Sequence, residues 1–173
     1  MTRAYSAALP IASIALRILI VLNALLGVGI LALLLVLPHR EWLIISLDLA
    51  GAADAERVIM GFRAVAVLGL VAVPLNHLLF TRLIAMVWTV RAGDPFVAAN
   101  ARRLQTIAWI LLVLQLLSLV IGGIGTAIST PEHPVDLDAG FSANGWLAVL
   151  LTFILARIFV EGTRIRDDLE GTV

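Results

Sequence analysis

The sequence contains no cysteine and no lysine, and it carries almost no charge within its long apolar stretches. The absence of cysteine excludes disulfides, thiolate metal sites, cysteine nucleophiles and a lipoprotein anchor. The twelve basic residues are all arginine, and they do not gather into the concentrated basic face typical of nucleic-acid binding. Walker A, Gly-rich dinucleotide and H-E-x-x-H patterns are also missing. We therefore expect no enzyme activity, no cofactor, no metal site and no direct contact with nucleic acid.

The sequence is rich in long apolar stretches. Of its 173 residues, 61% are hydrophobic, and the mean hydropathy is +1.06. A soluble domain is typically about 45–50% apolar. Four stretches are each close to the roughly 20 residues that a helix needs to cross ~30 Å of hydrocarbon. They are residues 18–37, 64–80, 107–128 and 141–160. The sequence therefore predicts an all-α membrane protein, a four-helix bundle that fills residues 1–173 as a single domain.

The arginines lie mostly on one side of these stretches. Nine flank the N-terminus, the second connection and the C-terminal end, whereas only Arg40, Arg57 and Arg63 lie on the other side. The third connection carries acidic residues and no arginine. Because arginine-rich segments stay in the cytoplasm, we expect a multi-pass protein with both termini cytoplasmic.

The second connection contains the sharpest local boundary, Gly93-Asp94-Pro95-Phe96. Gly93 suits the left-handed conformation that ends many helices. Asp94 is a good N-cap, and Pro95 suits the first position of a helix, where its missing N–H is not needed. We therefore expect one helix to end before Gly93 and the next to begin at Pro95.

The helices around this connection are expected to be longer than the bilayer core. A helix from Pro95 to about Ser129 is on the order of 50 Å long at 1.5 Å per residue. The preceding helix is expected to begin at Ala55 and to continue through Arg91, and the last helix is expected to continue through Leu169. Helices two, three and four should then extend into the cytoplasm as a helical hairpin and a C-terminal helix.

The first outer connection leaves two alternatives open. Residues 42–49 show partial strand-like alternation, and one alternative is a small extracytoplasmic β element with residues 135–138. The same segment can instead lie flat at the membrane interface, anchored by Trp42. Histidines and carboxylates also lie on this outer side, but their spacing matches no metal motif, so we interpret them as solvated surface. They are His39, Asp48, Asp54, Glu132, His133, Asp136 and Asp138.

Two sequence motifs carry a family resemblance. Gly93-Asp94-Pro95-Phe96, followed by Asn100 and Leu104, is similar to the pattern G-x-P-F-x-x-x-N-x-x-x-L. Residues 158–165 (IFVEGTRI) and 168–173 (DLEGTV) are similar to F-x-x-G-x-x-L and an acidic tail ending in Thr-Val/Ile. Ile165 replaces the usual leucine, and Gly171 interrupts the acidic run. Together these stretches resemble the DUF2975 family of small bacterial membrane proteins.

The resemblance covers roughly the last half of the chain. It implies four helices in the bacterial inner (cytoplasmic) membrane and no established activity. Members often resemble one half of a pair with a small helix-turn-helix regulator, so the resemblance implies such a regulator as a candidate partner.

The first functional hypothesis is a regulatory or signalling protein whose cytoplasmic hairpin and C-terminal helix bind a cytoplasmic protein. Asp94 and Asn100 are expected to shape the hairpin, and the arginines are expected to contact the partner. The same arginines can bind anionic lipid, at about 1 kcal/mol each near the surface. The candidate partner-binding residues are Arg91, Asp94, Phe96, Asn100, Arg103, Arg164 and Asp168.

The second hypothesis is a small oligomeric transporter or channel. Pro74 leaves the Leu70 carbonyl without its helical partner, and a kink beside His77 would suit a transport site. The competing interpretation is hydrogen bonding between helices, worth on average about 0.6 kcal/mol per contact. The intramembrane polar residues are Asn23, Asn76, His77 and Gln115. A third hypothesis is a structural subunit of a larger membrane complex, and small residues in the spans also allow a homo-oligomer.

Overall fold

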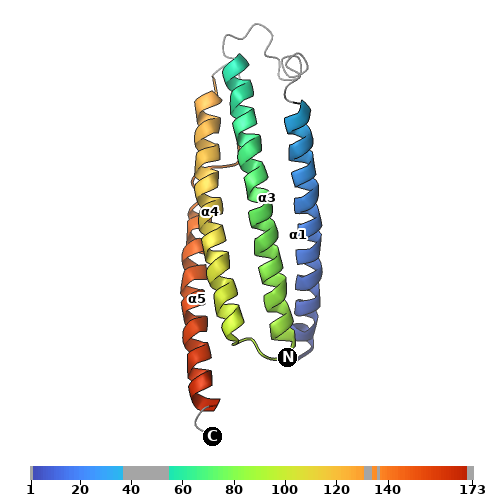
Figure 1. Ribbon diagram of the computed structural model, residues 1–173, viewed down its shortest axis with the longest axis vertical. Coiled ribbons are helices and arrows are strands. Elements are labelled where there is room, and N and C mark those ends of the chain that lie inside the picture. Colours follow the sequence, from blue (N-terminus) through green and yellow to red (C-terminus); the bar gives the residue numbers. More distant parts are fainter. Residues whose placement is uncertain (1, 37–54, 131–133, 136, 171–173) are drawn as a thin grey trace.

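The chain folds into four long helices (Figure 1). The computed structural model describes residues 2–36, 55–130, 134–135 and 137–170. The helices are α1 (Thr2–Val36), α3 (Ala55–Arg91), α4 (Ala98–Ile128) and α5 (Ala143–Glu170). Each is long and apolar enough to cross a membrane. The predicted all-α fold with four candidate spans is confirmed for the described residues, and it indicates a multi-pass membrane protein.

Most of the predicted helix limits agree with the structure. Helix α3 begins at Ala55 and ends at Arg91, as expected, and α4 and α5 end within one residue of the predicted positions. Helix α1 begins far before residue 18. The apolar run marks only the membrane-spanning part, whereas the alanine-rich segment before it has a high intrinsic helix propensity.

The alternative of an outer β element is not supported where the structure can test it. Residues 135, 137 and 138 form no strand. Residues 42–49, the other half of the predicted pair, lie outside the described residues, as do the candidate outer ligands except Asp138, which is exposed.

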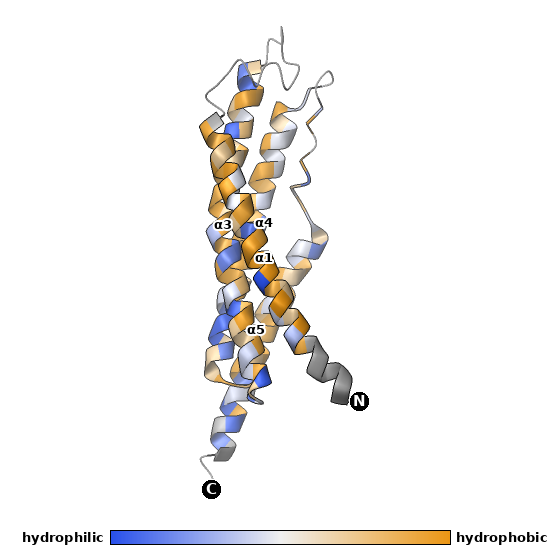
Figure 2. Ribbon diagram, turned by 90° about the vertical axis from the view of Figure 1, so that its right-hand side faces the viewer, coloured by the Kyte–Doolittle hydropathy of each residue, from blue (hydrophilic) through white to orange (hydrophobic). Residues whose placement is uncertain are grey.

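The four helices form an open row rather than a closed bundle. Helix α1 packs on α3, α3 on α4, and α4 on α5. Helix α1 crosses α3 at an angle, so that its N-terminal part diverges from the other helices (Figure 2). The described helices therefore enclose little common interior, and most of each helix surface faces outward.

Hydrophobic residues make up much of these helices (Figure 2), and many of their large apolar side chains are exposed. Val28 and Leu35 of α1 are 66% and 69% exposed, and large apolar residues on the other three helices are exposed to a similar degree. Exposing a large apolar side chain to water costs about 1.5–3 kcal/mol. Helices of this length with apolar outer faces are the structures that lipid accepts, because all their internal backbone groups are paired. The exposed faces therefore indicate contact with the bilayer.

Two small apolar clusters join α1, α3 and α4. Ala55, Val58, Ile59 and Ala66 of α3 are buried, and residues of α1 pack against them. A second cluster joins α3 to α4 through Leu79, Ile107 and Ile110. The two clusters hold α3 in the middle of the molecule, between α1 and α4.

The start of α5 is positioned by Ser118 and Gly122 of α4. The Ser118 hydroxyl accepts a hydrogen bond from the Gly140 N–H at 3.1 Å and lies 3.3 Å from the Gly140 carbonyl. A Cβ at Gly122 would lie 2.6 Å from the Gly140 Cα, so only glycine allows this approach. Gly140 itself has φ 127°, which an L side chain rarely adopts. Because Ser118 and Gly122 are small, the segment that leads into α5 can pack directly on α4.

Candidate functional site

Helix α3 ends in a Schellman motif at Gly93. Gly93 has φ 84°, its N–H donates to the Val90 carbonyl at 3.1 Å, and the Asp94 N–H donates to the Thr89 carbonyl at 3.1 Å. These two bonds satisfy carbonyls that the end of a helix would otherwise leave unpaired. The predicted left-handed Gly93 is confirmed.

The expected start of the next helix at Pro95 is wrong. Helix α4 begins at Ala98, and its N-cap is Val97, an extended residue that makes no side-chain cap bond. The Pro95 carbonyl accepts a hydrogen bond from the Asn100 side chain at 2.8 Å, which replaces the helical bond. Asp94 is not the cap because its carboxylate pairs with Arg166. Residues 92–97 therefore form a short connection, which we call the braced turn.

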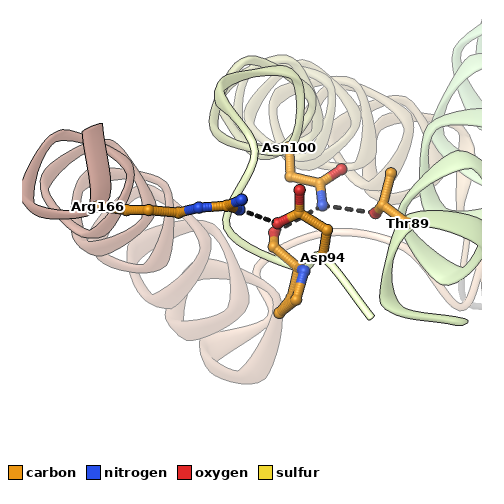
Figure 3. Close-up of polar contacts among 5 residues, drawn as sticks. Thr89, Asp94, Asn100 and Arg166 are labelled. Atoms are coloured by element: carbon orange, nitrogen blue, oxygen red, sulfur yellow. Dashed lines mark hydrogen bonds and ion pairs between the residues drawn. The ribbon is translucent and has the colours of Figure 1, made fainter. Parts of the chain in front are cut away.

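The Asn100 side chain holds the braced turn in place (Figure 3). It is fully buried, and its Nδ2 donates to the Thr89 Oγ1 at 2.6 Å and to the Pro95 carbonyl at 2.8 Å. Its Oδ1 accepts from the Arg103 Nη1 at 2.8 Å. Burying an amide is costly unless its donors and acceptor are paired, and here they are. One side chain thus joins the end of α3, the braced turn and the first turns of α4.

Thr89 and Arg103 complete this network. The Thr89 hydroxyl donates to the Met86 carbonyl at 2.8 Å, which leaves its oxygen free to accept from Asn100. Arg103 is half-buried, and its Nη1 also lies 3.4 Å from the Ala85 carbonyl. Arg103, predicted to contact a partner, is therefore directed toward the inside of the hairpin.

The other side of the braced turn packs on α5. The rings of Phe96 and Phe159 lie with centroids 5.1 Å apart and planes tilted by 32°. A Cβ at Gly162 would lie 3.1 Å from the Phe96 ring, so the ring rests on bare helix backbone. Arg166, one turn further along, pairs with Asp94 (Figure 3). Phe159, Gly162 and Arg166 are spaced by three and four residues, which places them on one face of α5.

These contacts bring the two family-like motifs together. The G-D-P-F segment supplies Asp94 and Phe96, and the F-x-x-G segment supplies Phe159 and Gly162. The aromatic pair is worth about 0.5–1.5 kcal/mol beyond its area. The Asp94–Arg166 side chains are 40% and 42% exposed, so this ion pair adds at most about 1 kcal/mol. The contacts define the position of α5 more than they add to its stability.

The remaining predicted partner-binding residues lie on the surface at the same end. Arg91 is exposed, and its guanidinium lies 5.2 Å from the centroid of the Trp88 ring. Arg164 and Asp168 are exposed on the last turns of α5. The seven predicted residues therefore divide into a structural group at the braced turn and an exposed group beside it.

Sequence reasoning missed four residues of this site. Thr89, Phe159, Gly162 and Arg166 all contact the braced turn or its asparagine. Phe159 and Gly162 were visible in the F-x-x-G motif, whose helical spacing marks one face of α5. Arg166 lies four residues after Gly162, on the same face of α5, whereas Arg164 does not, so helical spacing was the signal that could have identified it.

The intramembrane polar residues lie at separate places. Asn23 is 8% exposed, and its Nδ2 donates to the Val73 carbonyl at 2.9 Å, which joins α1 to α3 beside Pro74. Helix α3 continues through this proline. Gln115 is buried at the α4–α5 interface, where a Cβ at Gly145 would collide with it. Its Nε2 has no hydrogen-bond partner among the residues that the structure describes.

The other two intramembrane candidates face outward to different degrees. Asn76 is half-buried, whereas His77 is exposed on the surface of α3. The four residues therefore do not converge on one site within a single copy of the chain. Across the ranges that the structure describes, no group of three or more His, Asp or Glu residues is placed to hold a metal ion.

Comparison with known families agrees with the two motifs. A family model described as "Protein of unknown function (DUF2975)" matches residues 35–173. The resemblance is thereby confirmed, and it extends over α3, α4 and α5 and the connections between them. No curated protein and no solved structure matches the chain.

Proposed function

The chain belongs to the DUF2975 family, whose function is unknown, and from that premise we propose a regulatory membrane protein that binds a cytoplasmic protein. The binding surface is formed by the braced turn and the C-terminal part of α5. The arginine distribution supports an inner-membrane orientation in which this end and both termini are cytoplasmic. The proposal includes no catalytic step.

The packing of the braced turn on α5 is the observation on which we base this function. A connection that only returns the chain to the membrane does not need a fully buried asparagine, an aromatic pair and an ion pair. Here these contacts hold two segments that are distant in sequence as one rigid surface. Rigid surfaces bind partners at a lower entropic cost than mobile ones.

The length of α5 adds to this argument. Its apolar stretch ends near Val160, but the helix continues to Glu170 with charged residues on its surface. Orientation in the membrane requires only that the arginines be present, and it does not require them to be ordered on a helix. An ordered charged extension is therefore better explained as a surface for binding.

The charges indicate the kind of partner. Arg91 and Arg164 are exposed at this end, on α3 and α5. Exposed arginines favour a partner with an acidic surface and accelerate its association. A small helix-turn-helix regulator, the partner that the family resemblance implies, would be held at the membrane by such a contact.

The transport hypothesis receives less support from this arrangement. The described helices form an open row, and His77 faces outward. A path lined by Asn76 and His77 would therefore have to form between copies of the chain.

Affinity capture from the native host tests the regulatory proposal. The full chain is cross-linked in its own membranes, purified in mild detergent and analysed by mass spectrometry. Arg91→Glu with Arg164→Glu is expected to reduce the captured protein by about tenfold or more, the effect of losing roughly 1.4 kcal/mol of binding free energy. Arg57→Glu reverses the charge of an exposed arginine at the other end of α3; it is the control for charge reversal outside this surface and should leave capture unchanged.

Two results would reject the proposal. One is undiminished capture by the Arg91→Glu/Arg164→Glu protein. The other is that no cytoplasmic protein is captured by the wild-type chain at all. Circular dichroism and gel filtration of each variant would show that the helices remain intact.

A further inference from the structure

A cationic pocket lies between α3 and α4, apart from the contacts of the braced turn with α5. It has a volume of about 330 Å³ and is lined by Arg82, Ala99, Arg102, Arg103 and Thr106. We propose that this pocket binds a phosphate group, and that the phosphate belongs to the headgroup of an anionic lipid.

The pocket has a strong excess of positive charge. Three of its five lining residues are arginines, and no Asp or Glu of the described chain forms an ion pair with any of them. Asp94, the acidic residue of the nearby turn, pairs with Arg166 instead. Guanidinium groups bind phosphate through paired, charge-assisted hydrogen bonds, which makes phosphate a suitable counter-ion.

The start of α4 adds to this charge. Helix α4 begins at Ala98, and Ala99 in its first turn lines the pocket. The N-terminal end of a helix carries a partial positive charge and unpaired N–H groups, which favour anions. The helix end and the three guanidiniums therefore act in the same direction.

One of the three arginines is already held in position. The Arg103 Nη1 donates to the Asn100 Oδ1 at 2.8 Å, and Asn100 is itself fully buried. A guanidinium carries five N–H donors, and the bonds that Arg103 makes use only Nη1. An arginine that is fixed before the ligand arrives loses less side-chain entropy on binding.

The level of the pocket along the helices points to a lipid phosphate. Arg82 is the first charged residue of α3 after Arg63 and lies two positions beyond the apolar stretch of residues 64–80, and Thr106 directly precedes the apolar stretch of α4 (residues 107–128). The arginines of the pocket are thus, at this end of the molecule, the charged residues nearest to the apolar stretches of both helices, which is where phospholipid headgroups are expected. Basic residues at this level are attracted to the surface of an anionic bilayer.

A neighbouring pocket provides the comparison. It lies between α4 and α5, has a volume of about 220 Å³ and is lined by Gln105, Phe153, Ala156, Arg157 and Val160. It contains a single arginine among mostly apolar side chains. Arg157 is exposed, and its substitution removes a positive charge outside the cationic pocket, so it is a control for the loss of arginine charge elsewhere on the protein.

Lipid titration of the purified full chain tests the proposal. The wild-type protein, Arg82→Gln/Arg102→Gln and Arg157→Gln are titrated in mild detergent with phosphatidylglycerol or phosphatidylcholine, and bound lipid is counted by native mass spectrometry. Arg103 is left unchanged because it supports Asn100. We expect the wild-type protein to prefer phosphatidylglycerol, and the double variant to bind it about tenfold or more weakly, as loss of two contacts of ~1 kcal/mol implies. Arg157→Gln should bind like the wild type.

A second arm distinguishes the source of the phosphate. Inorganic phosphate is titrated against the same three proteins by isothermal calorimetry. Binding of inorganic phosphate that depends on Arg82 and Arg102, without preference for phosphatidylglycerol, would support the phosphate site and assign it to a soluble ligand. The proposal would be overturned if the double variant, with unchanged circular dichroism, bound phosphatidylglycerol and inorganic phosphate as well as the wild type does.

Discussion

The Asp94 carboxylate of the braced turn pairs with the Arg166 guanidinium of α5, 72 positions later in the chain. The pair lies next to the Phe96–Phe159 contact, so a charge pair and an aromatic pair connect the same two segments. These contacts connect α3, the braced turn and α5 into one continuous surface, and Arg91 and Arg164 lie at this end of the molecule.

This ion pair predicts recovery on charge exchange. Asp94→Arg and Arg166→Asp should each loosen the C-terminal part of α5, because each leaves like charges facing one another. The cost is at most about 1 kcal/mol, as both partners are partly exposed. The rate of proteolysis after residue 160 should rise in each single variant. The double variant, with the charges exchanged, should return toward the wild-type rate, and failure to do so would show that the pair does not hold α5.

Asn100 is predicted to be the most sensitive polar position at this end. Asn100→Ala removes the partner of Thr89, of the Pro95 carbonyl and of Arg103, and each buried group left unpaired costs about 1–3 kcal/mol. The melting temperature in mild detergent should fall by several degrees. Asn76→Ala, at a half-buried asparagine of α3, is the matched control and should have a smaller effect. Equal effects of the two substitutions would contradict the assigned role of Asn100.

Gly162 is predicted to tolerate no large side chain. A Cβ there already lies 3.1 Å from the Phe96 ring, so Gly162→Leu must displace the ring or move α5 away from the braced turn. Capture of the cytoplasmic partner should decrease while the helical content stays constant. Gly29→Leu is a suitable control because nothing lies within 4 Å of a Cβ at that position. Undisturbed capture by Gly162→Leu would separate partner binding from the packing of α5.

The orientation in the membrane is directly testable because the chain has no cysteine. Arg164→Cys and Glu56→Cys each introduce one exposed thiol, at opposite ends of the molecule. In spheroplasts, a membrane-impermeant maleimide should label Glu56→Cys at once and Arg164→Cys only after permeabilisation. The reverse pattern would place the braced turn outside the cell and end the proposed function.

Local rules were sufficient to predict much of the fold. The spans follow from apolar length, and Gly93 follows from the left-handed residue that a Schellman motif requires. The start of α4 was predicted incorrectly because Asp94 suits two roles equally well, helix cap or ion-pair partner. Which of these two roles Asp94 takes depends on Arg166, which is 72 positions away in the chain. A local sequence pattern therefore cannot predict the role.

Local rules also do not predict which polar residues of the apolar helices are buried and which are exposed. Asn23 and His77 are both polar residues in apolar helices, yet Asn23 is buried against α3 and His77 is exposed. In a membrane, the lipid-facing and protein-facing sides of a helix are both apolar, so the sequence period that marks the core of a soluble protein is absent. Packing alone decides which polar residue meets a partner.

The contact between Phe96 and Phe159 is central to the packing of the braced turn on α5, and site-specific cross-linking tests it most directly. Phe96→Cys/Phe159→Cys, in a chain otherwise free of cysteine, is treated in native membranes with a short bis-maleimide, whose spacer covers the distance that the two rings fill. Phe96→Cys/Ile158→Cys, with the second thiol on the neighbouring exposed face of α5, is the control. We predict rapid intramolecular cross-linking of the first pair and slow cross-linking of the second. Equal rates for the two pairs, or no cross-link in the first, would contradict the packing of the braced turn on α5.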